Sequence, residues 1–338
     1  MLRLTPPFIL SPMAGLTDSA FRRLVKRLGG CGLVVTEMVS SEGIARGLER
    51  TFAHAEFTGE ERPVAVQLFG GDPGRMARAA QQVERLGADV VDVNMGCPVP
   101  KVAKGMAGCR LMRDPERAAA IVSAMAGAVS IPVTVKIRSG WNENEVNAPE
   151  LAYRLEEAGA AAIAVHGRTA AQSYSGQADW DLIARVARAV SIPVYGNGDC
   201  IDPGDMVRRM NESGVAGVLV GRGALRTPWI FAQAAALAAG QPPVEVSLAD
   251  RGRFLLEYID MLLAEGPGNR PAAGHARWVV NKLRALCAWY TRGLDGGAHL
   301  REAVNHAPSI AALRETISQF FFEPGLTTRG STDAEGSD

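Results

Sequence analysis

Short apolar runs alternate with amphipathic stretches over the first two thirds of the chain. Three of these runs follow a glycine that would end a helix: GADVVDVNMG at 87–96, GAAAIAVHG at 159–167 and GVAGVLVGRG at 214–223. A glycine followed by a buried apolar run is typical of a helix that turns into a parallel strand. The pattern therefore predicts repeated strand–helix units.

The apolar runs predict eight strands. They lie near residues 7–12, 33–37, 64–69, 90–94, 133–138, 162–166, 193–196 and 216–220. Amphipathic stretches separate them, most clearly at 73–87 and 179–190. Eight such units indicate a TIM (β/α)8 barrel, an α/β fold. The main alternative is an open doubly wound sheet, which usually has fewer strands and a GxGxxG fingerprint after its first strand. This sequence has no such fingerprint there.

The pattern changes after Pro242-Pro243, where helical spacing replaces the strand signal. Helices are predicted near residues 248–265, 272–291, 297–305 and 309–322. The last stretch is polar and rich in Gly and Ser, which is typical of disorder. We therefore expect three segments: a barrel domain over 1–242, a small all-helical C-terminal domain over 243–325 and a disordered tail over 326–338.

Composition narrows the function classes. The 36 basic residues balance 36 acidic ones, so no global field draws the protein to a polyanion and any nucleic acid must be held by local clusters. Five cysteines at wide spacings, without a CxxC pair, argue against a disulfide framework or a zinc site and favour a reducing cytoplasm. The apolar part of the N-terminus is too short for a signal peptide, and Gly and Pro interrupt both long uncharged stretches, so no membrane span is expected.

Polar and cationic residues gather where the predicted strands end. The strand-end residues with such side chains are Ser11, Glu37, Gln67, Asn94, Lys136, Arg138, His166, Arg168, Asn197, Asp199 and Arg222, with Cys97 just past the fourth strand. In a TIM barrel these ends share the catalytic face. Some strand-end polar residues only mark the end of a strand. However, Gln67, Lys136 and His166 lie within otherwise apolar runs, and convergent polar groups of this kind favour a ligand site over satisfied core residues.

The residue types suggest the class of ligand. The seventh and eighth strands end in the glycine-rich turns NGD (197–199) and GRG (221–223), the corner where TIM barrels commonly bind a phosphate. Gln67 and Lys136 can hydrogen-bond the edge of a polar heterocycle, and Lys136 can stabilise negative charge on a reduced ring. These demands fit a flat phosphorylated cofactor such as FMN. The strand ends lack the carboxylate cluster of a divalent-metal site and a Ser-His-Asp arrangement, so no metal is expected.

Several motifs together resemble one enzyme family. They are PMAGLTDSAFR (12–22), QLFG (67–70), NMGCP (94–98), VKIRSGW (135–141), HGRT (166–169), NGD and GRG. The set resembles the tRNA-dihydrouridine synthases, most closely their bacterial B-type branch. The likeness extends from about residue 4 to residue 322 and includes GHARWVVNKLRALCAWY at 274–290.

The resemblance implies an FMN enzyme that reduces the C5–C6 double bond of a uridine in tRNA, with NADPH as the reductant. By motif, the implied cofactor-binding residues are Pro12, Met13, Ala14, Gln67, Lys136, His166, Asn197, Gly198, Asp199, Gly221 and Arg222. The implied substrate-binding residues near the uracil are Asn94, Arg138 and Arg168. Cys97 is implied as the general acid that protonates C5 after hydride transfer from flavin N5 to C6.

A thiol suits the role that the resemblance gives Cys97. With a reference pKa of about 8.5, a cysteine holds its proton at neutral pH and can release it to a strong carbon base. The alternative for Cys97 is an inert small hydrophobe, which is the commonest fate of a cysteine. For Asn94 it is a turn residue that ends the strand, and for His166 a satisfied core histidine.

Two acid-free stretches are candidates for RNA binding. Residues 93–113 contain Lys101 and Lys104, and residues 266–294 contain Arg277, Lys282 and Arg284. On a helix, Arg277 and Arg284 share one face with Asn281, while the buried stripe comprises Val279, Leu283, Leu286 and Tyr290. The alternative is an ordinary solvated helix face.

Two other functions stay open from the residues alone. A flavin barrel that reduces a small molecule, such as a dihydroorotate dehydrogenase-like enzyme, would not need a basic helical domain. An RNA-binding protein that has lost catalysis would not need an intact flavin site or Cys97. We expect neither of these, but the tRNA-dihydrouridine synthase that the resemblance implies: a monomeric enzyme of the cytoplasm whose partners are tRNA and NADPH.

Overall fold

The computed structural model describes residues 2–48, 51–52, 54–103, 105–266 and 271–323. The chain divides into two compact units. One comprises Met1–Ala224 with Pro228–Pro243, and the other comprises Leu225–Thr227 with Val244–Asp338. The predicted tail over 326–338 lies outside the described residues.

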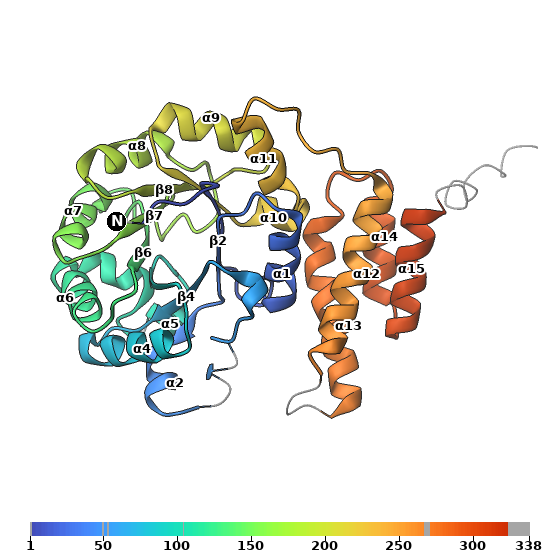
Figure 1. The fold of residues 1–338 in the computed structure, drawn as a ribbon, viewed down its shortest axis with the longest axis horizontal. Helices are drawn as coiled ribbons and strands as arrows, with labels where there is room; N and C mark the ends of the chain where they lie inside the picture. Colours follow the sequence, from blue (N-terminus) through green and yellow to red (C-terminus); the bar gives the residue numbers. More distant parts are fainter. Residues whose placement is uncertain (1, 49–50, 53, 104, 267–270, 324–338) are drawn as a thin grey trace, which may run out of the picture. The chain divides into compact units, whose positions relative to one another are not determined.

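The first unit is a closed barrel of eight parallel strands, as predicted (Figure 1). The strands are β1 Phe8–Leu10, β2 Leu33–Val35, β4 Val64–Phe69, β5 Val90–Met95, β6 Val133–Arg138, β7 Ala162–His166, β8 Val194–Asn197 and β9 Gly217–Val220. The pairings of β1 with β9 and of β2 with β4 close the sheet. A further strand, β3 Val39–Ser40, pairs with β4 and was not predicted, because two residues are too short to show a period.

Helices surround the barrel and connect its strands (Figure 1). They are α1 Ser19–Leu28, α2 Ser41–Ala45, α4 Pro73–Arg85, α5 Pro100–Ala103, α6 Pro115–Ala126, α7 Ala148–Glu157, α8 Trp180–Ala189, α9 Pro203–Ser213, α10 Arg222–Arg226 and α11 Ile230–Ala238, with 3-10 turns η1 Gly59–Glu61 and η2 Gly108–Arg113. Three of them share a start signal: an aspartate caps the first turn and a proline follows it, at Asp72, Asp114 and Asp202. The capping aspartate and the proline set the residue at which each of these three helices begins.

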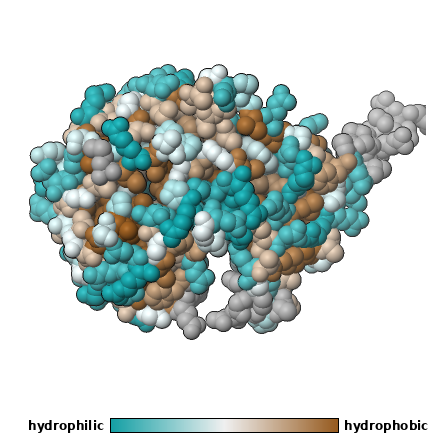
Figure 2. All heavy atoms as spheres, in the orientation of Figure 1, coloured by the Kyte–Doolittle hydropathy of each residue, from teal (hydrophilic) through white to brown (hydrophobic). Residues whose placement is uncertain are grey.

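Strand alternation divides each barrel strand between two environments. In β6, Val133, Val135 and Ile137 pack outward against the helices, while Thr134 and Lys136 face the interior. The interior begins with an apolar layer that comprises Ile9, Leu33, Val35, Ala65, Val90, Ala162, Tyr195 and Leu219. Polar side chains follow it toward the carboxyl ends of the strands. On the face seen in Figure 2, hydrophilic residues cover much of the outer helices.

The described part of the second unit is helical. Its helices are α12 Leu248–Ala264, α13 Ala272–Tyr290, α14 Gly297–His306 and α15 Ile310–Phe322, close to the predicted bounds. The predicted stripe of α13 is buried, and its Tyr290 stacks on Phe254 of α12 with ring centroids 5.7 Å apart. A membrane-crossing helix, long and apolar enough to span a bilayer, is absent from the described residues.

Candidate functional site

A hydrogen-bonded network lies inside the barrel above the apolar layer. Gln67 on β4 donates through Nε2 to Asp92 Oδ2 at 2.7 Å, and Asn94 Nδ2 donates to Gln67 Oε1 at 2.8 Å. Thr134 Oγ1 donates to Asp92 Oδ1 at 2.6 Å. The barrel register causes these contacts, because Gln67 pairs with Asp92 and Asp92 pairs with Thr134 across adjacent parallel strands. Burial raises the pKa of Asp92, whereas the hydrogen bonds from Gln67 and Thr134 and the charge of Lys136 oppose that shift.

Lys136 extends into the same interior from β6. Its Nζ donates to Asn197 Oδ1 on β8 at 3.2 Å. Desolvation, aided by the nearby charge of Arg138, lowers the pKa of Lys136 to about 8. A cavity of about 30 Å³ lies between Asp92, Thr134 and Lys136. That volume suits a water molecule, so a larger ligand must lie above this layer, at the carboxyl ends of the strands.

His166 ends β7 beside these cations. Its ring is 7% exposed, and desolvation followed by the charges of Lys136, Arg138, Arg168 and Arg222 lowers its pKa to about 2. The imidazole is therefore neutral at physiological pH. A neutral imidazole donates from one nitrogen and accepts at the other, so His166 contributes a hydrogen-bonding group rather than a charge.

Two buried arginines hold the loop that follows β7. Arg138 donates to the carbonyl of Gly96 at 2.8 Å and to the carbonyls of Thr169 and Ser173, both at 2.9 Å. Arg168 donates to the carbonyls of Ser175 and Gly176 within the same loop. Much of the hydrogen-bonding capacity of both side chains therefore goes to backbone. Their predicted contacts with a substrate stay predictions.

A second cluster comprises Asn197, Gly198, Asp199, Gly221 and Arg222, which we call the phosphate corner. Arg168 Nη2 lies 2.8 Å from Asp199 Oδ1, and Arg222 Nη2 lies 3.4 Å from the same oxygen. Burial alone would raise the pKa of Asp199, but the N–H of Ala178 and the guanidinium of Arg168 lower it overall. The carboxylate thus holds two cations together at the carboxyl ends of β7 and β8.

One feature beside the phosphate corner fits an anionic group, and a second constrains the backbone of the corner. The Nη1 atom of Arg168 is buried and has no hydrogen-bond partner in the protein, and an unpaired buried donor of this kind is costly unless a ligand accepts from it. At Gly198, φ is 138° and an added Cβ would lie 2.4 Å from Ala178 Cβ. The left-handed φ and the close approach of Ala178 therefore require a glycine at this turn. The predicted phosphorylated cofactor fits these residues.

The PMAG motif follows β1 at the same end of the barrel. The N–H of Met13 donates to Thr17 Oγ1 at 2.9 Å, which closes a turn, and Ala14 is exposed. A Cβ added at Gly221 would lie 3.2 Å from Met13 Sδ, so this turn reaches the phosphate corner. Pro12 and Lys136 line the same small interior cavity. The structure therefore brings Pro12, Met13 and Ala14 to the predicted site.

Cys97 is the least buried of the five cysteines. It is partly exposed, whereas Cys31, Cys109, Cys200 and Cys287 are buried. Its N–H donates to Asn94 Oδ1 at 2.9 Å, and its carbonyl accepts from the N–H of Cys109 at 3.1 Å. Asn94, one residue before the end of β5, therefore fixes the turn that carries the thiol.

Sequence reasoning missed three residues of this region. Asp92 and Thr134 complete the interior network. The sequence marks them only as a charged and a hydroxyl side chain within apolar runs. Tyr174 is 60% exposed, and its ring centroid lies 5.2 Å from Arg222 Cζ and 5.7 Å from Arg138 Cζ. An exposed tyrosine in a loop carries no sequence signal of its own, because its position depends on how Arg138 and Arg168 fold the loop.

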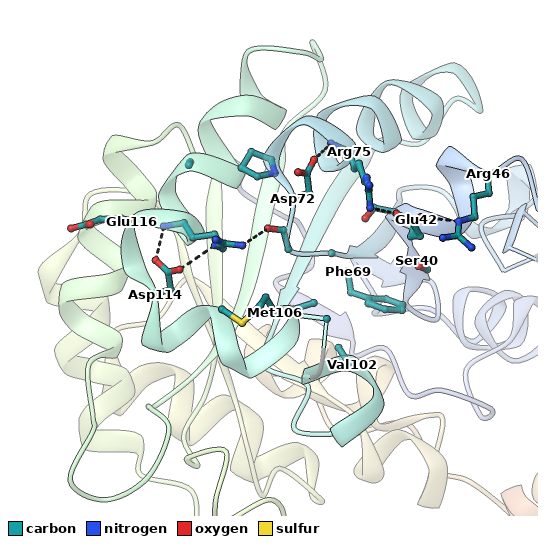
Figure 3. Close-up of a pocket in the computed structure, with 18 residues that line it drawn as sticks. Ser40, Glu42, Arg46, Phe69, Asp72, Arg75, Val102, Met106, Asp114 and Glu116 are labelled. Atoms are coloured by element: carbon teal, nitrogen blue, oxygen red, sulfur yellow. Dashed lines mark hydrogen bonds and ion pairs between the residues drawn. The ribbon is translucent and has the colours of Figure 1, made fainter.

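A separate cleft of about 900 Å³ lies beside the barrel, next to α2, α4 and α6 (Figure 3). Its arginines pair with carboxylates that line the same cleft: Arg46 and Arg75 with Glu42, and Arg117 with Asp114. None of the predicted cofactor-binding or catalytic residues lines it. The predicted cofactor-binding residues and the unpartnered Nη1 of Arg168 lie instead at the carboxyl ends of the strands, so we take that end of the barrel as the candidate site. Among the described residues, no three His, Cys, Asp or Glu side chains are grouped to hold a metal.

The predicted RNA-binding residues differ in how far the structure describes them. Lys104 lies outside the described residues, and only the backbone of Lys101 is described, in α5. On α13, Arg277 is exposed and Lys282 Nζ lies 5.5 Å from the ring of Trp278. Arg284 donates to the carbonyls of Val304 and Ala307 at 3.5 and 3.1 Å, so it joins α13 to α14.

Comparisons with known proteins agree on one family. The family described as Dihydrouridine synthase (Dus) matches residues 9–320. A protein of Rhodobacter capsulatus named "Probable tRNA-dihydrouridine synthase" is 43% identical over 94% of this chain and 97% of its own length. The "tRNA-dihydrouridine synthase B" of Pseudomonas aeruginosa is 39% identical over 93% of this chain and 92% of its own.

One solved structure supports the fold alone. Histamine dehydrogenase from Rhizobium sp. 4-9 superposes with a TM-score of 0.52 at 13% identity. The match covers 75% of this chain and 49% of that one. At this identity the likeness concerns the arrangement of strands and helices and carries no argument about the reaction.

Proposed function

Because the chain belongs to the dihydrouridine synthase family, we propose that it reduces uridine in tRNA to 5,6-dihydrouridine, using bound FMN and NADPH. The observation that carries the proposal is the position of Cys97. Its partly exposed thiol follows β5, and its backbone is hydrogen-bonded to Asn94, which also contacts Gln67. The thiol that we propose as the proton donor thus belongs to the same end of the barrel as the motifs proposed to bind the cofactor.

The phosphate corner would hold the phosphate of FMN. The buried Nη1 of Arg168 and the guanidinium of Arg222 would supply the positive charge that binds it. Pro12, Met13 and Ala14 would line the ring system from the turn after β1. Gln67 and Lys136 would meet its polar edge, since both side chains extend from the interior of the barrel.

The reaction adds two hydrogen atoms across the C5–C6 bond of uracil. FMN, when bound and reduced, supplies the hydride that goes to C6. The Cys97 thiol would donate its proton to C5, so that the C5–C6 π bond is lost and a C–H bond forms at each carbon. The turn at Asn94 holds the backbone of the acid in place during this step.

The remaining residues would position the uracil. His166 is neutral at physiological pH, so it can donate one hydrogen bond to a carbonyl oxygen without adding charge. Asn94 and Arg138 would supply further donors, whereas the unpartnered Nη1 of Arg168 is proposed for the phosphate in place of the uracil contact that the motif implies. Negative charge that develops on the ring would be stabilised by cations nearby. The target base must leave the folded RNA to reach this site, as in other enzymes that act on a base.

The helical domain over 243–325 would bind the tRNA backbone. Arg277 and Lys282 carry positive charge on α13, and Lys101 and Lys104 would extend the contact from the barrel. Arg284 stays in the proposed set, although two carbonyls already occupy its donors. All five cysteines are free thiols, which suits a reducing cytoplasm. The monomeric state stays a prediction.

Replacement of the proposed acid tests the function. We expect Cys97→Ala to keep its flavin and to bleach with NADPH but to lose dihydrouridine formation on tRNA, measured by mass spectrometry of the digested RNA. Undiminished product would refute the assigned acid. Wild-type protein without a flavin spectrum would favour a non-catalytic RNA-binding protein, and flavin turnover with a free pyrimidine but not with tRNA would favour a small-molecule reductase.

A further inference from the structure

An oriented line of hydrogen bonds joins the buried carboxylate of Asp92 to the backbone of Cys97. Gln67 donates to Asp92, Asn94 donates to Gln67, and Cys97 donates to Asn94, at 2.7, 2.8 and 2.9 Å. The side-chain amides of Gln67 and Asn94 each donate from their nitrogen to the group nearer Asp92. Each accepts at its oxygen from the group nearer Cys97. The line therefore has a single polarity from the carboxylate to the turn that carries the thiol.

The carboxylate determines that polarity. The two ends of a Gln or Asn side-chain amide have nearly the same shape, so packing alone does not select their orientation. Both oxygens of Asp92 accept hydrogen bonds, Oδ1 from Thr134 and Oδ2 from Gln67. Gln67 therefore turns its nitrogen toward Asp92 and its oxygen toward Asn94. Asn94 must then present its nitrogen to Gln67. Its oxygen is left to accept from the N–H groups of Gly96 and Cys97, at 3.2 and 2.9 Å.

A merely structural role does not explain a carboxylate at this position. Asp92 is 6% exposed and lies next to an apolar interior layer that a valine would extend. Burying a carboxylate is costly even when it is hydrogen-bonded. The Asp92 side chain accepts hydrogen bonds from Gln67 and Thr134, so any specific role of the carboxylate acts through these two residues.

We propose that Asp92 is a positioning residue for Cys97: acting through Gln67 and Asn94, it fixes the turn from which the thiol reaches the substrate. This inference rests on the proposed function, because it assigns Cys97 the role of proton donor. The positioning itself is a property of the free protein and can be measured without any reaction.

Three variants test the line of hydrogen bonds. Asp92→Leu keeps the approximate size but removes both acceptors. Asp92→Asn keeps one acceptor for Gln67, because its nitrogen can turn toward the Thr134 hydroxyl, and should therefore rescue the line. Thr134→Val is the matched control, since it removes one hydrogen bond to Asp92 and leaves the path to Cys97 complete. If Asp92→Leu does not fold, Asp92→Ala, which leaves space rather than filling it, takes its place.

Hydrogen exchange of the Cys97 amide and alkylation of its thiol by iodoacetamide report the position of the turn. In folded Asp92→Leu we expect both rates to change by at least about fivefold from wild type. In Asp92→Asn and Thr134→Val both should stay within about twofold. Dihydrouridine formation per bound flavin should fall in Asp92→Leu by about tenfold or more.

Exchange and alkylation rates in Asp92→Leu that equal those of wild type would overturn the inference, and so would an Asp92→Asn variant as altered as Asp92→Leu. These outcomes are separate from failure of the proposed function. If wild type forms no dihydrouridine, the proposed function fails, and if Cys97→Ala still forms it, the assigned acid fails. In both cases the exchange and alkylation rates still decide whether Asp92 positions Cys97.

Discussion

Lys136 on β6 and Asn197 on β8 meet across the strand that separates them, with Lys136 Nζ 3.2 Å from Asn197 Oδ1. The amide nitrogen of Asn197 donates to the carbonyl of Leu219 at 2.9 Å, so the amide oxygen is held toward the ammonium group. Desolvation nevertheless lowers the pKa of Lys136 to about 8. The cost of this buried charge to folding therefore depends on pH between about 8 and 10.5.

The first prediction concerns stability and pH. In the unfolded chain Lys136 has its ordinary pKa of 10.5, against about 8 in the fold. Between these values the unfolded state binds more protons, so this lysine makes the free energy of unfolding rise with pH over that window. Below pH 8 the full cost of the buried charge is present. We expect flavin-free Lys136→Met to be more stable than wild type at pH 7, by at most about 3 kcal/mol.

The advantage of Lys136→Met should shrink as pH rises from about 8 toward about 10.5, because the folded lysine is already neutral there and removing the proton from the unfolded lysine costs less as pH rises. Urea unfolding of both proteins at several pH values across this range measures it. A difference in unfolding free energy that stays constant with pH would contradict the lowered pKa of Lys136.

The second prediction concerns selective thiol chemistry. Burial raises the pKa of Cys31 to about 11 and of Cys200 and Cys287 to about 12. It also raises the pKa of Cys109. Thiolate is the reactive form of cysteine, so iodoacetamide should label the partly exposed Cys97 at least about tenfold faster than the others. Peptide mass spectrometry locates the label, and labelling should end dihydrouridine formation.

Protection supplies the control for this labelling. Bound tRNA should slow modification of Cys97, and a Cys97→Ser variant should take up little reagent under the same conditions. Modification of any of the four buried cysteines at the rate of Cys97 would show that the exposure of these thiols in solution differs from the structure.

Features of this fold that depend on neighbouring residues in the sequence could be predicted from it, whereas features that depend on contacts between distant segments could not. The eight barrel strands could be predicted because each is an apolar run bounded by a turn signal, and these are local features. The polar residues at the strand ends could be predicted because parallel strands place all their carboxyl ends together. Strand β3 could not, since Val39 and Ser40 show no period.

The partners of those polar residues could not be predicted. Asp92 contacts Gln67 and Thr134 only because the barrel register places the three side by side. The carbonyl partners of Arg138 and Arg168 depend on the conformation of the loop after β7, and the sequence contains no pattern for it. Long-range register and loop conformation, rather than residue type, decide which groups remain available to a ligand.

The third prediction concerns the phosphate corner. At Gly198 the backbone has a φ of 138°, and a Cβ would collide with Ala178 Cβ at 2.4 Å. We expect Gly198→Ala to cost about 1–3 kcal/mol of stability and to lower the flavin content of the purified protein. Gly127→Ala is the matched control, since φ is −75° there and the nearest atom, an oxygen of Ser123, lies at 3.4 Å. Normal flavin loading by folded Gly198→Ala would argue against a phosphate at this turn.

The fourth prediction separates two arginines of α13 that share one helix face. Arg277 is exposed, so Arg277→Ala should weaken tRNA binding and reduce the dependence of log Kd on log salt by about one unit, with little change in stability. Arg284 donates to the carbonyls of Val304 and Ala307, so Arg284→Ala should lower the thermal stability of the helical domain by about 1–3 kcal/mol. Filter binding at several salt concentrations and thermal unfolding measure the two effects.

Arg253→Ala is the control on α12, where an exposed arginine pairs with Asp250. Equal losses of tRNA affinity in Arg253→Ala and Arg277→Ala would mean that α13 has no special part in binding, because a diffuse field would then account for both.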